Sequence, residues 1–290
     1  MKKKALKYTL GLFLLYGLLF FVGCREEPII EVSETHAGTE QSLQVFSELL
    51  STYDIIEDFV SSNDLLFKKE ESLLPSGVVI KIIDDDFLDG DGVEVVLDFG
   101  ELGDEPHGLL CKDKKYRAGT IRILSDKPYS SPGAKISLIF SKEDPFYSGA
   151  GDKMILIQGE MYVERVGDQS ITMQCSALKF QDGDEEISLI TNLAFEKIHE
   201  AGLGILDDEI AISGELLLKK ETGEVMLTSV SPIKKKYTLD CAQHIIAGKL
   251  DLNQSTSMSK ISVDFDPTGD QLCDNKVVIT VNGKALLYEY

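Results

Sequence analysis

The sequence has no tryptophan and only 4 histidines and 5 cysteines among its 290 residues. The lack of tryptophan disfavours carbohydrate-binding surfaces that rely on indole rings, although tyrosine and phenylalanine can substitute. No Cys-x-x-Cys pair, His-Glu-x-x-His helix, Gly-x-Ser-x-Gly elbow or phosphate-binding loop is present, and the histidines and cysteines do not form a complete zinc-ligand motif. We therefore expect neither an enzyme nor a zinc protein.

Basic residues are also scarce, with 29 Lys and Arg against 49 Asp and Glu and a net charge of −20. The densest basic cluster, Lys234-Lys235-Lys236, stands alone, and we interpret it as a solvated strand end. A strongly acidic surface repels nucleic acid and anionic lipid head groups. Nucleic acid is therefore excluded as a partner.

The first 24 residues have the layout of an export signal. Lysines at the start are followed by an uncharged stretch from Tyr8 to Gly23, which is shorter than the roughly 20 residues of a membrane-spanning helix. The end of this stretch, Phe20 to Cys24, resembles a bacterial lipoprotein signal, with Phe21 where the usual motif has leucine. We expect residues 1–23 to be a cleaved lipoprotein signal peptide and Cys24 to be acylated. The alternative is an uncleaved membrane anchor with an incidental cysteine.

Acylation of Cys24 implies a lipid-anchored protein of the bacterial cell envelope, in the outer membrane. Two or more acyl chains, palmitate among them, make a stable anchor. Without residues 1–23 and their four lysines, 25 basic and 49 acidic side chains remain, a net charge of −24. Arg25-Glu26-Glu27 resembles a short signal for display on the cell surface; the alternative is a solvated acidic tether.

Residues 24–39 are polar and lack apolar periodicity, which predicts a flexible tether. Residues 40–62 then carry apolar side chains at steps of three and four, from Leu43 through Phe46 and Leu49 to Val60, which predicts one amphipathic helix. Its polar face carries acids, namely Glu48, Asp54, Glu57 and Asp58. Because a membrane-surface helix needs basic residues there, we expect this helix to pack on the following domain.

Residues 78–290 alternate apolar and polar side chains in short runs separated by turn signals such as Asn282-Gly283. No second helix is long enough for crossovers between parallel strands. We therefore predict a mainly β fold, either an antiparallel β-sandwich or an extended meander of about a dozen strands. Asn282-Gly283 predicts a type I′ hairpin. Gly159, Gly214 and Gly248, each within a strand, indicate bulges, bends or close backbone approaches.

Two stretches of the β region resemble each other, 95–121 and 261–284. Each has a strand ending in Asp-Phe, a loop closing on cysteine and a further strand, which suggests a region built from two similar halves. The chain also resembles uncharacterised Bacteroidota (Flavobacteria-like) lipoproteins over roughly residues 90–290. The residues that carry this resemblance are Leu97-Asp98-Phe99-Gly100, Cys111, Arg117-x-Gly119-Thr120-Ile121, Leu239-Asp240-Cys241, Ile246-x-Gly248 and Leu272-Cys273-Asp274-Asn275-Lys276. It implies fold class and location, and no activity.

Four cysteines besides Cys24 remain in an exported chain, which predicts disulfides or free buried thiols. Four cysteines allow three pairings. The cysteines that close the strands in the resembling stretches imply a preferred bond between Cys241 and Cys273.

The most acidic loop carries Asp84, Asp86, Asp89 and Asp91 together with two glycines. Such a loop is a calcium candidate, because Ca²⁺ prefers carboxylate oxygens, but the spacing does not match an EF-hand. The alternative is a solvated turn.

Together these features favour a non-catalytic interaction or structural module of the envelope, whose partner is an envelope protein or a glycan. One alternative is a carrier of an apolar ligand, which predicts a large apolar cavity. Another is an envelope hydrolase, which predicts a cleft with convergent carboxyl groups of raised pKa.

Overall fold

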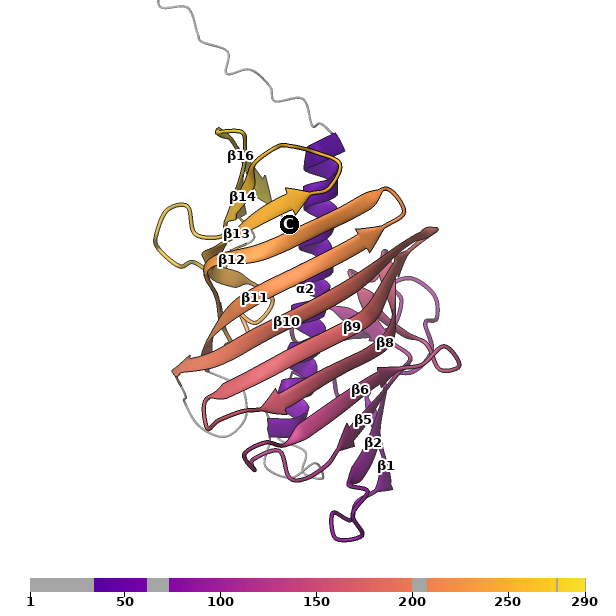
Figure 1. Ribbon diagram of the computed structural model, residues 1–290. Coiled ribbons are helices and arrows are strands. Elements are labelled where there is room, and N and C mark those ends of the chain that lie inside the picture. Colours follow the sequence, from indigo (N-terminus) through magenta and orange to yellow (C-terminus); the bar gives the residue numbers. More distant parts are fainter. Residues whose placement is uncertain (1–33, 62–72, 200–207, 275, 290) are drawn as a thin grey trace, which may run out of the picture. The chain divides into compact units, whose positions relative to one another are not determined.

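The computed structural model describes residues 34–61, 73–199, 208–274 and 276–289. Its fold is mainly β, with one antiparallel sheet of 16 strands and a helix, α2 (Glu34–Ser61), near the N-terminal end of the chain (Figure 1). Residues Glu34–Tyr290 form one compact unit, so both stretches of the weak internal repeat contribute to the same sheet, through β2 and β14.

The first eight strands are β1 (Val79–Asp84), β2 (Val93–Asp98), β3 (Leu109–Leu110), β4 (Tyr116–Ala118), β5 (Thr120–Ser125), β6 (Lys135–Phe140), β7 (Phe146–Gly149) and β8 (Met154–Arg165). The others are β9 (Ser170–Asp182), β10 (Glu185–His199), β11 (Glu209–Lys220), β12 (Gly223–Lys236), β13 (Ile245–Gln254), β14 (Ile261–Asp264), β15 (Lys276–Val281) and β16 (Lys284–Glu289). Their main path is β1-β2-β5-β6-β8-β9-β10-β11-β12-β13-β14-β15-β16, and β7 joins β4 and β3 to β8. The fold is the predicted extended meander, and the sandwich alternative is wrong because the strands form one sheet.

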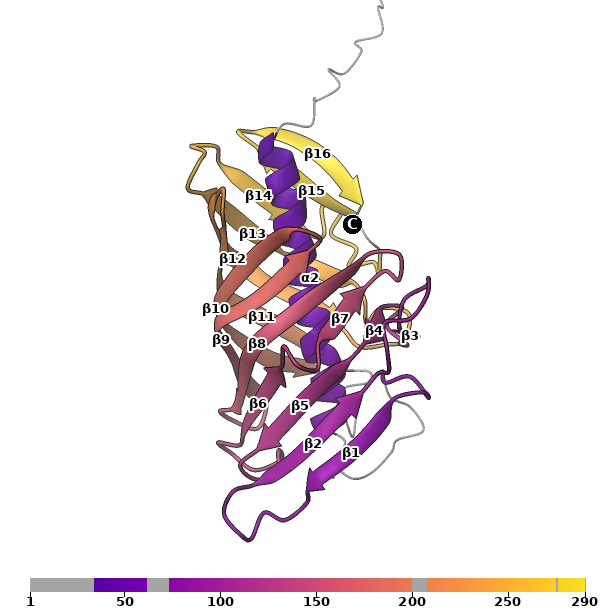
Figure 2. The ribbon, with the colours of Figure 1, turned by 90° about the vertical axis from the view of Figure 1, so that its right-hand side faces the viewer.

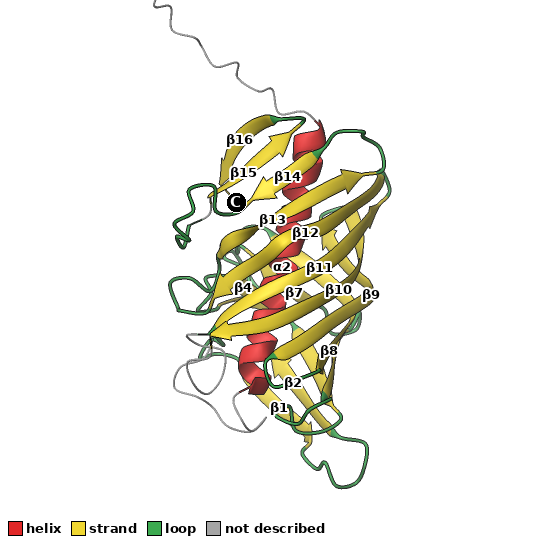
Figure 3. Ribbon diagram, turned by 60° about the vertical axis from the view of Figure 1, so that its left-hand side comes forward, coloured by secondary structure: helices red, strands yellow, loops and turns green. Residues whose placement is uncertain are grey.

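The sheet curls around α2 (Figures 2 and 3). Strand burial alternates as the period of two requires: in β10, Leu189, Thr191, Leu193 and Phe195 are buried, while each residue between two of them is exposed. The inward side chains and α2 share one apolar cluster.

Three glycines bend the long strands, as predicted. Gly159, Gly214 and Gly248 have φ of +114°, +139° and +119° and lie beside register shifts in their ladders. A Cβ on Gly214 would lie 2.3 Å from the carbonyl oxygen of Asn192. Because a bulge increases local twist and bend, these positions help the sheet to curl.

The last hairpin also agrees with its prediction. Asn282 and Gly283 have φ of +50° and +83°, and Val281 pairs with Lys284 across this two-residue loop. Positive φ at both loop positions is the requirement of a type I′ turn.

Helix α2 begins six residues earlier than predicted, at Glu34, so residues 34–39 of the predicted tether are helical. The first turns of the helix are stabilised by contacts that apolar periodicity in the sequence does not indicate. Thr39 is fully buried, and the Ser42 hydroxyl donates to the carbonyl oxygen of Gly38 over 2.7 Å. Residue 62 lies outside the described residues.

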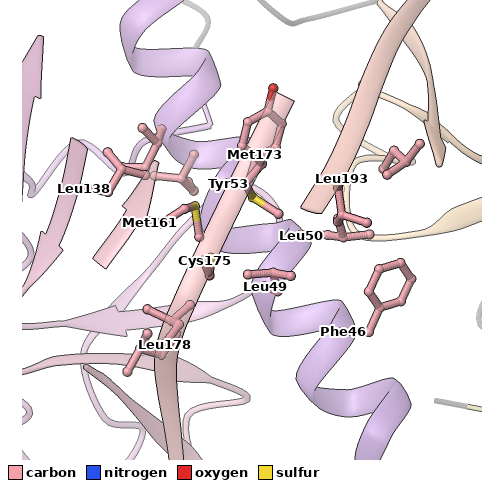
Figure 4. Packing of buried hydrophobic residues seen from close by; sticks show 14 of the residues in the cluster. Phe46, Leu49, Leu50, Tyr53, Leu138, Met161, Met173, Cys175, Leu178 and Leu193 are labelled. Carbon is pink, nitrogen blue, oxygen red and sulfur yellow. The ribbon is translucent and has the colours of Figure 1, made fainter. Parts of the chain in front are cut away.

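Packing against the sheet occupies one side of α2 (Figure 4). Phe46, Leu49, Leu50 and Tyr53 are at most 2% exposed and face apolar side chains of the concave side of the sheet. The ring of Tyr53 lies 4.3 Å, centroid to centroid, from that of Phe195 on β10. The expectation that the helix packs on the β domain is confirmed. None of the helical residues described forms a stretch long and apolar enough to cross a bilayer.

Candidate functional site

The predicted lipidation residue, Cys24, lies outside the described residues, so its acylation stays a prediction. The same holds for the signal peptide 1–23 and for residues 24–33 of the tether.

Cys241 and Cys273 form a disulfide that joins the segment between β12 and β13 to the loop between β14 and β15. Their Cα atoms lie 5.1 Å apart, within the normal range for disulfides. Cys111 and Cys175 are free buried thiols, and burial raises the pKa of Cys175 to about 12. The four cysteines therefore divide into one disulfide, with the preferred pairing, and two thiols held in their protonated form.

The acidic loop brings together three of its four predicted calcium ligands. Carboxylate oxygens of Asp84, Asp89 and Asp91 lie within 4.8 Å of one another. Asp86 does not belong to this group; its carboxylate accepts a 2.7 Å hydrogen bond from the backbone N–H of Leu88. Asp89 and Asp91 are exposed, so the arrangement fits a solvated turn as well as a cation site.

The four acids that were predicted to form the polar face of α2 are buried. Glu48, Asp54, Glu57 and Asp58 are only 1–2% exposed, and they do not form a separate solvated face, because Asp54 and Glu57 follow Leu50 by four and seven residues and share its side of the helix. A buried charge is costly unless it is paired and hydrogen-bonded. Each of these four side chains has found a partner on a different part of the chain.

Asp54 contacts the end of β12. Lys235 donates to one of its carboxylate oxygens, and the Tyr237 hydroxyl donates to the other over 2.5 Å. The side chain of Lys235 is 3% exposed, which corrects the prediction that Lys234-Lys235-Lys236 is solvated: Lys235 points inward with Ile233 and Tyr237. Burial raises the pKa of Asp54 despite the neighbouring ammonium group.

Glu57 contacts two tyrosines. Its Oε2 accepts hydrogen bonds from the hydroxyls of Tyr129 and Tyr53, and no described residue hydrogen-bonds its buried Oε1. Burial raises the pKa of Glu57, while these hydrogen bonds and the charges of Lys197 and Arg165 act in the opposite direction.

Glu48 and Asp58 join two further segments to α2. The Glu48 carboxylate accepts hydrogen bonds from Lys115, just before β4, and from the Ser148 hydroxyl of β7, at 2.8 Å in the latter case. Asp58 accepts a 2.8 Å hydrogen bond from the backbone N–H of Leu73. The acids of one helix thus hold segments that are far apart in sequence.

Two further buried ion pairs lie in the same interior. Arg117 of β4 donates to both carboxylate oxygens of Asp113, at 2.8 and 2.6 Å, and to the carbonyl oxygen of Ser51 in α2 at 3.1 Å. Burial lowers the pKa of Arg117, but Asp113 outweighs burial and the net direction is upward. Lys197 of β10 pairs with Asp208 at 3.0 Å. Arg117 can therefore help to position α2, and both pairs are buried and not accessible to a substrate.

A polar cleft of about 940 Å³ lies beside the first turns of α2. Its walls are the hairpin connections that follow β7, β9, β11 and β13, with Tyr288 of β16. A second cleft of about 410 Å³ shares Glu40, Gln44, Lys153 and Tyr288 with the first. These four residues therefore join the two clefts into one trough.

Hydrogen bonds within the wall hold this cleft in shape. The side-chain amide of Gln41 donates to Glu185 over 2.7 Å, and its oxygen accepts from Lys220. Lys153 pairs with Asp182 at 2.6 Å. Burial lowers the pKa of Lys220, with Glu185 acting in the opposite direction. The cleft is a built concave surface of amides, hydroxyls and paired charges.

The sequence predicted neither the buried charges nor the cleft. A signal for the charges does exist, because Lys197 and Lys235 occupy inward positions in strands that alternate with a period of two. The cleft has no such signal, since its residues come from four hairpin connections, the last strand and one helix.

The molecule thus belongs to the class of open antiparallel sheets wrapped around a helix. Comparisons with protein-family models, with curated proteins and with solved structures each gave no match.

Proposed function

We propose that this protein is a lipid-anchored module of the bacterial cell envelope, related to Bacteroidota lipoproteins, that binds a partner or supports envelope structure without catalysing a reaction. Cys24 carries the anchor, and the outer membrane is its location. The lipoprotein-like signal that ends at Cys24 supports the anchor. The Cys241–Cys273 disulfide supports export, because disulfides persist in oxidising compartments.

The observation that carries the proposal is the filling of the concave side of the sheet by α2. A carrier of an apolar ligand would use that side, but the apolar side chains of α2 occupy it. A hydrolase would place carboxyl groups of raised pKa in a cleft, whereas Asp54 and Glu57 lie in the packed interior. The surfaces of the domain are therefore the better candidates for its function.

Metabolic labelling with an alkyne-bearing fatty acid tests the anchor. We expect the full-length protein to be labelled and the Cys24→Ser variant to stay unlabelled, with Cys175→Ser labelled like the wild type. Label on the Cys24→Ser variant would contradict the proposal. Protease treatment of intact cells then reports which side of the outer membrane the domain occupies.

Lipid analysis of the purified protein tests the binding module against the carrier. We expect fatty acid covalently bound at Cys24 and no stoichiometric extractable lipid. One equivalent of extractable lipid in both the wild type and Cys24→Ser would favour the carrier instead.

A further inference from the structure

We propose that the trough beside the first turns of α2 is a binding site for a neutral oligosaccharide. This inference rests on the proposed function as a binding module, and it names the class of partner. The larger cleft, at about 940 Å³, lies at the upper end of the 300–1,000 Å³ typical of ligand sites. Its continuation into the second cleft favours an extended ligand over a single sugar unit.

Charge compensation within the wall favours a neutral ligand. Of the charged groups around the larger cleft, Lys153 is paired with Asp182, and Gln41 bridges Lys220 to Glu185. Glu224 pairs with Lys219 at 3.5 Å. Glu40 also lines the cleft and is the one charged lining residue without a described ion pair or hydrogen bond. With the other charges compensated within the wall, the cleft offers directed hydrogen bonds and only a weak net negative field. The net charge of −20 for the chain further disfavours anions.

The hydrogen-bonding groups of the wall suit hydroxyl-rich ligands. Gln44 presents an amide from α2, and Thr222, Thr256 and Ser257 present hydroxyls from two hairpins. An amide both donates and accepts, and a hydroxyl does the same, so such groups match sugar hydroxyls, which also do both. An apolar ligand would leave these groups without partners, which is unfavourable.

Tyr288 supplies the apolar contact that a sugar ring needs. Its side chain is half-buried, packs against the core and lines both clefts. A ring fixed in this way presents one apolar surface and a polar edge, which suits the C–H face and the hydroxyls of a pyranose. It can take the place of the tryptophan that the sequence lacks.

Titration of the full-length protein with chitotetraose and with maltotetraose tests this site. The protein is kept in a detergent without a sugar head group, and binding is followed by saturation-transfer NMR and calorimetry. We expect at least one of the two oligosaccharides to bind with Kd of about 1 mM or tighter. Spermidine and inorganic phosphate, added separately, should not displace it.

Matched glutamine variants locate the binding. Gln44→Ala should weaken it roughly three- to tenfold, the worth of about one hydrogen bond. Gln174→Ala, at an exposed position of β9, should leave it unchanged. The Tyr288→Phe variant keeps the aromatic ring. Its Kd for the oligosaccharide should lie within about threefold of the wild-type value, which corresponds to less than one hydrogen bond. Thermal melting of each variant shows that it is folded.

Three outcomes would overturn the inference: no binding of either oligosaccharide to folded protein, equal weakening by both glutamine variants, or displacement by spermidine or phosphate. The anchor proposal is tested separately by labelling at Cys24, so it survives any of them. Shortening of the bound oligosaccharide over hours would instead contradict the non-catalytic function and leave the binding site intact.

Discussion

In the middle of α2, Phe46, Leu49 and Leu50 pack against apolar side chains of the sheet, and one to two turns further along the helix Asp54 and Glu57 meet buried polar partners. Both sets of residues are buried, but they hold the helix through different physics. Apolar packing is strong and tolerates small shifts, because the hydrophobic effect has no direction. A buried ion pair adds little net stability, because desolvation offsets the attraction, yet it strongly disfavours any arrangement that separates the partners.

In this fold, the strength with which the sheet holds α2 and the exact position at which it holds α2 therefore come from different residues. The apolar residues hold α2 in the concave side of the sheet. The acidic residues define the depth and rotation at which it sits, since Asp54 must meet Lys235 and Glu57 must meet Tyr129.

Lys235→Met should have the largest effect, because it leaves the carboxylate of Asp54 buried without its cation. Breaking a buried pair in this way costs about 3–5 kcal/mol, which urea denaturation of the full-length protein would measure. Asp54→Asn combined with Lys235→Met removes both charges and keeps an acceptor for Tyr237, so it should regain most of the loss. If the double variant is as unstable as the single one, the pairing is not what matters.

Leu49→Ala tests the apolar residues and should cost about 2–5 kcal/mol, from lost burial and the cavity left behind. Leu49→Met conserves volume and should cost less than about 1.5 kcal/mol. The same urea experiment measures both variants. A loss below about 1 kcal/mol for Leu49→Ala would show that the interior collapses easily and that α2 is not tightly packed.

Glu57→Gln should have a smaller effect that depends on pH. Because burial raises the pKa of Glu57 in the folded state, its proton is held more tightly there than in the unfolded chain, where the pKa is about 4.3. The wild type therefore loses stability relative to the variant as pH rises from about 4.3 through the folded pKa, by at most about 1.4 kcal/mol per pH unit. Melting temperatures of both proteins from pH 4 to 8 would show the difference.

Glu94→Gln is the control of opposite sign. The exposed hydrogen bond from Arg122 lowers the pKa of Glu94. The Glu94–Arg122 pair therefore stabilises the folded protein at neutral pH, and this contribution is lost as pH falls. As a surface pair it should contribute no more than about 1 kcal/mol and should weaken with added salt. A parallel pH trend in the two variants would contradict the contrast between buried and exposed carboxyl groups.

The fold class could be predicted from the sequence because local sequence signals determine it. Periodicity of two marked the strands, periods of three and four marked α2, and Asn282-Gly283 and the strand glycines marked a hairpin and the bulges. Single sheet versus sandwich was not predictable, because both bury the same alternating residues. The helix start was misplaced because residues 34–39 are helical without carrying the apolar periodicity on which the prediction rested.

The interior ion pairs and the cleft escaped prediction for a related reason. An acid on a helix looks the same in sequence whether it faces water or a lysine that follows 181 residues later, as Lys235 follows Asp54. The cleft assembles loops from across the chain, and a single sequence carries no signal for which loops meet. The cysteine pairing was inferred through a resemblance, not through geometry.

The distance along the chain between α2 and its partners also bears on the order of folding. Asp54 leaves the ribosome long before Tyr237, 183 residues later, and contacts of such long range slow the folding of a domain. Until β12 is in place, α2 has apolar and acidic groups whose partners do not yet exist. A chain that ends before residue 235 therefore lacks Lys235, the cation that pairs with Asp54 of α2. We expect such fragments to be degraded rather than to accumulate.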